Sequence, residues 1–179
     1  MKAIIMRGIS GSGKSTEANR IAQELSDQGK SAVIVSADDY FIDDDGEYKF
    51  DSRYLDKAHG MCMAQFMAMI TEVDAVIVDN TNTQLWEISP YILVAKSAHC
   101  YDIEIVRCEC DPKVAAARNV HGVPEKGIIA MAGRMEKLLP FWPREKVVRT
   151  DKANPFSEEG GYGSPTRYAA LHPERITNE

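Results

Sequence analysis

The chain has 179 residues, 44% of them hydrophobic, which is enough for the core of one globular domain. Its net charge of −6 argues against a surface that coats nucleic acid nonspecifically. The charge is uneven, because residues 113–149 carry eight basic and three acidic side chains and could bind an anion. The N-terminal apolar run is too short for a signal peptide, and no run reaches membrane-spanning length. We therefore expect a soluble, cytoplasmic protein that does not enter a membrane.

Strand-like and helix-like runs alternate along the chain. The predicted strands are Lys2–Arg7, Ala32–Val35, Ala75–Val78, Ile103–Cys108 and Val147–Val148. The predicted helices cover residues 14–28, 55–72, 89–98, a short stretch from Asp111-Pro112, and 128–139. This alternation predicts an α/β fold, in which a five-stranded parallel sheet is covered by helices on both faces. Residues 1–149 are expected to form the domain, and residues 150–179 a loop-like tail.

Four cysteines are present, and their spacing does not require disulfides in a chain of this length. A zinc site formed by His99, Cys100, Cys108 and Cys110 is conceivable. Buried thiols are the favoured interpretation.

Residues 8–15 match the phosphate-binding motif G-x-x-x-x-G-K-[ST], placed between a predicted strand and a predicted helix. Glycines let backbone N–H groups surround a phosphate, and the helix N-terminus adds positive potential. Lys14 is expected to reach the β- and γ-phosphates, and Ser15 to bind Mg²⁺. The expected phosphate-binding residues are Gly8, Ser10, Gly11, Ser12, Gly13, Lys14, Ser15 and Thr16. A glycine-rich turn without a ligand is the alternative, but spacing, residue types and context all favour a nucleoside triphosphate.

Asp38 and Asp39 follow the second predicted strand within the sequence Ser36-Ala-Asp-Asp-Tyr-Phe41. Because parallel strands end at one edge of the sheet, both carboxylates should face the phosphate loop. An Asp there can accept the proton of a hydroxyl that receives a phosphoryl group. On extended backbone the two side chains point in different directions, so one could face the acceptor while the other anchors the loop. Alternatively, both cap the next turn.

Asp79 follows the third predicted strand and is expected to hold Mg²⁺, directly or through water. A simple helix cap is the alternative. Asn80 and Asn82 contact either the acceptor or the loop backbone. Tyr40, Phe41 and Tyr48 either stack on a base or pack the segment around them.

The order of these motifs resembles that of a known kinase domain. The phosphate loop, the S-x-D-D-Y-F stretch, V-D-N-T-N-T at residues 78–83 and A-R-N-V-H-G-V-P at residues 117–124 look like the 5′-hydroxyl polynucleotide kinase-like P-loop domain. That domain occurs in phage end-healing kinases and in eukaryotic ubiquitin-ligase-binding proteins. The similarity spans about residues 1–139 and is closer to the eukaryotic type. It implies a P-loop NTPase fold with a helical lid at about residues 113–127.

The resemblance also implies roles for individual residues. It implies that ATP and Mg²⁺ are the cofactors, that Asp38 is the general base, and that Lys14 is the phosphate lysine. Arg118 is similar to a lid arginine that reaches over the triphosphate. Arg134 is either a second phosphate contact or part of a surface ion pair. The implied acceptor-side residues are Asp39, Tyr40, Phe41, Asn80 and Asn82.

Two departures leave the acceptor open. Phe41 stands where the phage prototype has an arginine that grips the acceptor phosphate, and the prototype's second lid arginine falls near His121 or Gly122. Residues 43–47 add four negative charges, which disfavour a polyanion. The favoured acceptor is the 5′-OH of a nucleic-acid end or nucleotide. A metabolite or nucleoside kinase, and an ATP-binding regulatory module without turnover, are the alternatives.

Overall fold

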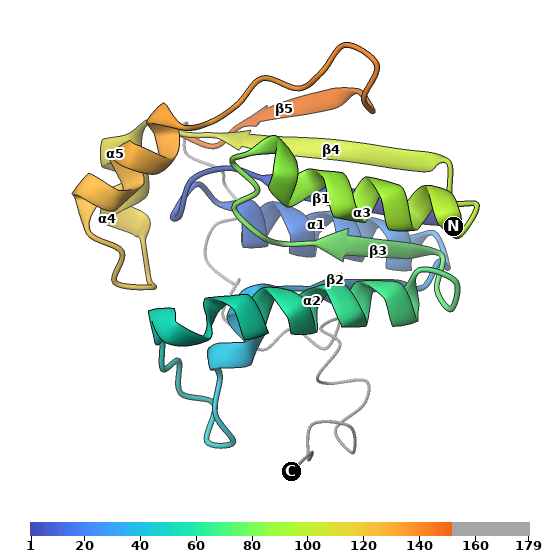
Figure 1. Cartoon of the computed structure of the whole chain (residues 1–179), viewed down its shortest axis with the longest axis horizontal. Coiled ribbons are helices and arrows are strands. Elements are labelled where there is room, and N and C mark those ends of the chain that lie inside the picture. Colours follow the sequence, from blue (N-terminus) through green and yellow to red (C-terminus); the bar gives the residue numbers. More distant parts are fainter. Residues whose placement is uncertain (152–179) are drawn as a thin grey trace.

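The computed structural model describes residues 1–151, which form a five-stranded parallel sheet with helices on both faces (Figure 1). The strands are β1 (Lys2–Arg7), β2 (Ala32–Val35), β3 (Ala75–Val78), β4 (Asp102–Glu109) and β5 (Glu145–Arg149). Their order in the sheet is β2-β3-β1-β4-β5, and every neighbouring pair is parallel. The predicted α/β fold with five parallel strands is therefore confirmed. Residues 152–179, most of the expected tail, lie outside the described residues.

Helices cover the two faces of the sheet unequally. The helices are α1 (Lys14–Asp27), α2 (Leu55–Met69), α3 (Leu85–Ser97), α4 (Pro112–Arg118) and α5 (Glu125–Gly133). One face packs Ile4 and Met6 of β1 against Ala18 and Ala22 of α1. The other face carries the larger apolar cluster, to which α2 and α3 contribute. Within residues 1–151 no helix is both long enough and apolar enough to cross a membrane.

Helices α4 and α5 lie together beyond the carboxyl ends of the strands, where β1 also enters the phosphate loop (Figure 1). Ile9 of that loop packs with Ala115 of α4 and Ile128 of α5 in a third apolar cluster. We call residues 112–133 the α4–α5 segment. It is thereby fixed to the phosphate loop by apolar burial.

Two predicted helix boundaries are wrong. The helix predicted to open at Ser89-Pro90 begins at Leu85, because the Glu87 carboxylate accepts a hydrogen bond from the Gln84 backbone N–H at 2.7 Å. Pro90 is tolerated inside α3, since the carbonyl it leaves unbonded belongs to Trp86, which is 68% exposed. The last helix spans Glu125–Gly133 instead of residues 128–139.

Buried thiols account for three of the four cysteines: Cys62, Cys100 and Cys108 are buried and Cys110 is partly buried. Cys100 precedes β4 and Cys108 lies near its other end, so the imagined zinc ligands are separated by an extended strand. Within residues 1–151 no three His, Cys, Asp or Glu side chains are grouped to hold a metal.

Candidate active site

The phosphate loop Gly8–Ser15 connects β1 to α1 at the carboxyl edge of the sheet. The φ angles are +151° at Gly8, +77° at Gly11 and +81° at Gly13, a conformation that side chains disfavour. A Cβ atom on Gly8 would lie 2.6 Å from Ser12 Oγ and 2.7 Å from the Cys108 carbonyl oxygen. The glycines therefore permit the tight backbone curl that a phosphate cradle requires.

Lys14 is held inside this curl. It is 9% exposed, and its Nζ donates a hydrogen bond to the Ile9 carbonyl at 2.9 Å. Burial lowers the pKa of Lys14, and the negative charges of Asp79 and Asp38 oppose that effect. An ammonium has three N–H donors, and only one hydrogen bond is formed within the described part of the chain. The side chain therefore fits an anionic phosphate group.

Ser15 and Asp79 are the two residues predicted to bind magnesium. Ser15 lies in the first turn of α1, and Asp79 follows β3, the strand that pairs with β1. Asp79 is 4% exposed and close enough to Lys14 to affect its pKa. Hydroxyl and carboxylate oxygens are ligands that Mg²⁺ prefers, so this pair fits the ion.

Asp38 and Asp39 do not lie on extended backbone, contrary to our expectation. They belong to a 3₁₀ helix, Ala37–Phe41, capped by Ser36 Oγ, which accepts a hydrogen bond from the Asp38 N–H at 3.2 Å. Successive residues of a 3₁₀ helix are rotated by about a third of a turn, so the two carboxylates still diverge. The Asp38 side chain is 43% exposed and can be reached from solvent.

Asn80 and Asn82 form hydrogen bonds with the backbone of two neighbouring elements, the 3₁₀ helix and β1. Asn80 Oδ1 accepts a hydrogen bond from the Ala37 N–H at 2.9 Å, and Asn82 Nδ2 donates to the Met6 carbonyl at 2.7 Å. Both side chains are buried, and Asn82 has a φ of +45°. These amides hold the 3₁₀ helix and β1 against the segment that follows β3.

The aromatic residues near Asp38 divide between packing and exposure. Phe41 is 5% exposed and its ring contacts the rings of Tyr40, Tyr48 and Phe50, so it packs this segment. Tyr40 stays partly exposed. The hydroxyl of Tyr48 donates to Asp38 Oδ1 at 3.2 Å, a contact that residue spacing could not reveal.

Part of the negative charge of residues 43–47 is neutralised by Lys49, which follows this stretch. Asp43 Oδ1 accepts hydrogen bonds from the N–H groups of Asp45 and Glu47, which form a tight turn. Lys49 forms ion pairs with both Asp43 and Glu47. The repulsion that this stretch would exert on a polyanion is therefore smaller than its sequence suggests.

Arg118 ends α4 close to the phosphate loop. Its exposed guanidinium donates to the Thr150 carbonyl at 2.7 Å, and Thr150 Oγ1 donates to the Ser12 carbonyl at 2.7 Å. Thr150 was assigned to the tail from sequence, and its contact with the loop was missed. Thr150 therefore connects Arg118 to the phosphate loop.

The hydrogen bonds of Asn119 were also not predicted from the sequence. Its Oδ1 accepts hydrogen bonds from the Ser10 hydroxyl at 3.0 Å and from the His121 N–H at 3.1 Å. His121 Nε2 in turn lies 3.8 Å from Asp38 Oδ2. Asn119 thus links the phosphate loop to the part of the α4–α5 segment that faces Asp38.

Arg134 does not lie within the helix predicted for it, because α5 ends at Gly133. Its Nε donates to Thr83 Oγ1 at 3.2 Å. This hydrogen bond connects the end of α5 to the loop after β3.

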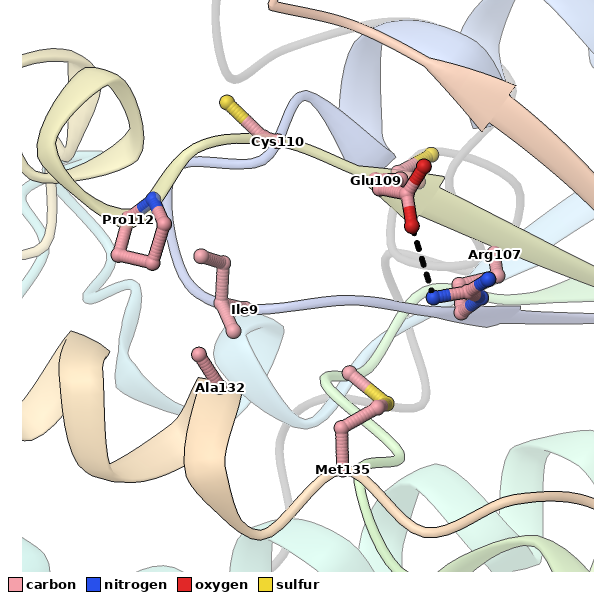
Figure 2. A pocket seen from close by; sticks show the side chains of 8 residues that line it. Ile9, Arg107, Glu109, Cys110, Pro112, Ala132 and Met135 are labelled. Carbon is pink, nitrogen blue, oxygen red and sulfur yellow. Dashed lines mark hydrogen bonds and ion pairs between the residues drawn. The ribbon is translucent and has the colours of Figure 1, made fainter.

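A small pocket of about 190 Å³ is lined by residues of the phosphate loop, of β4 and of the α4–α5 segment (Figure 2). Apolar side chains of Ile9, Pro112, Ala132 and Met135 line it, and the ion pair between Arg107 and Glu109, at 3.2 Å, lies at one side. Lys14, Asp38 and Asp79 are not among the residues that line this pocket.

The fold and the phosphate loop define a P-loop kinase-like domain. Over residues 4–127 the chain matches the family model described as an AAA domain. Since that match covers more than half of the chain, the protein belongs to this family. Human NEDD4-binding protein 2 is 34% identical over 141 residues, which are 76% of this chain and 8% of that protein.

Solved structures agree on the fold. Chaetomium thermophilum Kti12, in complex with ADP-AlF3, superposes with a TM-score of 0.61 at 17% identity, covering 84% of this chain and 90% of that chain. The Mycobacterium tuberculosis APS kinase CysC, in complex with AMPPNP and APS, gives a TM-score of 0.56 at 19% identity, covering 85% and 90%. At these identities the similarity shows the fold alone.

Proposed function

We propose that the protein is an ATP- and Mg²⁺-dependent kinase that transfers the γ-phosphoryl group to a hydroxyl, with the 5′-OH of a polynucleotide or nucleotide as the favoured acceptor. The observation that carries this proposal is the position of Asp38 directly after β2, at the carboxyl edge of the sheet where the phosphate loop and Lys14 also lie. A protein that only binds nucleotide needs no carboxylate there.

In the proposed reaction the acceptor oxygen forms a bond to the γ-phosphorus, and the bond from that phosphorus to the β–γ bridging oxygen breaks, releasing ADP. Asp38 accepts the proton of the acceptor hydroxyl. Lys14 and Arg118 stabilise negative charge on the transferring group. Ser15 and Asp79 would hold Mg²⁺, which when bound neutralises charge on the β- and γ-phosphates. The α4–α5 segment is the proposed lid.

The choice of a 5′-OH acceptor is supported by the order of motifs and by the partial neutralisation of the acidic stretch by Lys49. A small-metabolite or nucleoside kinase is the second candidate, because Phe41 replaces the arginine that would grip a nucleic-acid phosphate. The fold relationship to an APS kinase is compatible with that candidate.

Incubation with γ-labelled ATP, Mg²⁺ and a panel of acceptors tests the proposal. The panel should contain 5′-OH DNA and RNA oligonucleotides, nucleosides and sugars, with 5′-phosphorylated oligonucleotides as matched controls. We expect label on the 5′-OH oligonucleotides or nucleotides. Label on another hydroxyl compound would support the metabolite kinase, and ATP binding without label on any acceptor would support the regulatory module.

A further inference from the structure

Tyr48 connects three parts of the site that are far apart in sequence. Its hydroxyl lies 3.2 Å from Asp38 Oδ1, and its ring centroid lies 4.8 Å from that of His121 in an edge-on arrangement. The ring also packs against Phe41, with centroids 6.1 Å apart. These two ring contacts restrict where the hydroxyl points.

The phenol can act on Asp38 only as a hydrogen-bond donor. Burial raises the pKa of Tyr48, and the charge of Asp38 and their hydrogen bond raise it further. The hydroxyl therefore keeps its proton, and an ionised carboxylate has only acceptors to offer. The hydrogen bond consequently selects one orientation of the Asp38 carboxylate.

That orientation leaves the other carboxylate oxygen available. Asp38 Oδ2 faces His121 Nε2 at 3.8 Å, which is longer than a hydrogen bond. Within residues 1–151 no direct hydrogen bond to Oδ2 is formed. Since the Asp38 side chain is 43% exposed, an acceptor hydroxyl can reach this oxygen.

We propose that Tyr48 is a positioning residue for phosphoryl transfer, which holds Asp38 Oδ1 so that Oδ2 accepts the proton of the acceptor hydroxyl. This inference rests on the proposed function, in which Asp38 is the base. His121, carried by the α4–α5 segment and tied through Asn119 to the phosphate loop, packs on the Tyr48 ring.

Tyr48→Phe tests the inference, because it removes the hydroxyl and keeps the ring contacts. We expect kcat to fall on the order of tenfold or more, the effect of losing one hydrogen bond to a charged group, while the ATP dissociation constant stays unchanged. Tyr101→Phe is the matched control. Tyr101 is 72% exposed and its hydroxyl lies 3.2 Å from His99 Nδ1, at the opposite edge of the sheet, so its loss should leave kcat unchanged.

A double-mutant cycle separates action through Asp38 from a general structural role. In an Asp38→Asn background, Tyr48→Phe should cost little further activity, because the oriented carboxylate is already gone. An equal loss in both backgrounds, or wild-type kcat in Tyr48→Phe alone, would overturn the inference. A wild-type protein that phosphorylates no acceptor would instead contradict the proposed function, and the positioning role would fall with it.

Discussion

In the proposed function, Lys14 is the side chain that acts most directly on the phosphates of ATP. It is buried, it forms one hydrogen bond, and burial lowers its pKa, so an anion at the loop would compensate its charge. Lys14→Ala should reduce kcat/KM by about 10²-fold or more, because the main cation beside the transferring phosphate is lost. Steady-state kinetics measures this loss, with the exposed Lys30→Ala as control. Activity of Lys14→Ala within about threefold of wild type would contradict the phosphate-loop assignment.

Arg118 tests the contribution of the α4–α5 segment at a single side chain. Its guanidinium is exposed and donates to a backbone carbonyl, so its removal leaves the core intact. Arg118→Ala should lower kcat by about 10-fold or more and change the melting temperature by no more than a surface substitution does. Kinetics and thermal unfolding on the same preparation check both expectations. A large loss of thermal stability with unchanged kcat would show that Arg118 is structural.

At the scale of elements, the contact between the phosphate loop and α4 is unusually close. A Cβ atom on Gly11 would lie 2.0 Å from the Ala115 carbonyl oxygen and 3.2 Å from the Asn119 nitrogen. Both of these are backbone atoms, so a side chain at Gly11 cannot be accommodated by a change of rotamer. The loop and α4 must separate if residue 11 is anything but glycine.

Gly11→Ala should therefore weaken ATP binding by more than about tenfold and lower the free energy of unfolding by about 2–4 kcal/mol, from backbone strain and overpacking together. Gly46→Ala is the matched control. Gly46 has a φ of +81°, close to that of Gly11, but its Cβ would meet nothing within 4 Å. Gly46→Ala should lower the free energy of unfolding by about 1–2 kcal/mol, from backbone strain alone, and its ATP affinity measured by calorimetry should be normal. Equal effects of the two variants would contradict the close contact.

All five strands were predicted from short apolar runs, whose length and content of β-branched residues favour strands over helices. The start of α3 was missed since Pro90 was taken as a first-turn signal, whereas Gln84 and Glu87 provide the cap five residues earlier. A proline costs little where the carbonyl that it orphans is solvent-exposed.

The site was predictable where local sequence determines geometry and not where the fold brings distant segments together. The phosphate loop follows from its own spacing. The bonds of Thr150 to Ser12 and of Tyr48 to Asp38 join segments 138 and 10 residues apart, and no periodicity encodes them. From the sequence, Asn80 and Asn82 could contact either a ligand or the protein backbone. Their burial and hydrogen bonds, which distinguish the two, come only from the structure.

At the scale of the whole molecule, the Arg7 side chain connects segments that are far apart in sequence. Its side chain is 1% exposed and donates to the Asn82, Thr83 and Glu136 carbonyls and to the Glu145 carboxylate. It therefore ties β1 to the loop after β3, to the segment after α5 and to β5. Burial lowers the pKa of Arg7, and Glu145 opposes that effect.

Arg7→Met should lower the free energy of unfolding by about 3–5 kcal/mol, since it leaves buried acceptors unpaired. Denaturant titration measures this change. Arg149→Met is the control, because the Arg149 side chain is 70% exposed and its ion pair with Glu109 should contribute at most about 1 kcal/mol. Similar losses of unfolding free energy in the two variants would contradict the role of Arg7 in holding these segments together.

In the proposed function, Asp38 removes the proton of the acceptor hydroxyl and does not hold the triphosphate. Kinetics of phosphoryl transfer by Asp38→Asn and Asp39→Asn, with ATP affinity measured directly on both variants, tests it most directly. We expect Asp38→Asn to lower kcat by about 10²- to 10⁴-fold and to leave ATP affinity nearly unchanged. We expect Asp39→Asn to affect mainly loop order or the acceptor KM. A severe Asp39→Asn with a mild Asp38→Asn would reverse the assignment. Mild effects in both would contradict it, and the two carboxylates would then be structural.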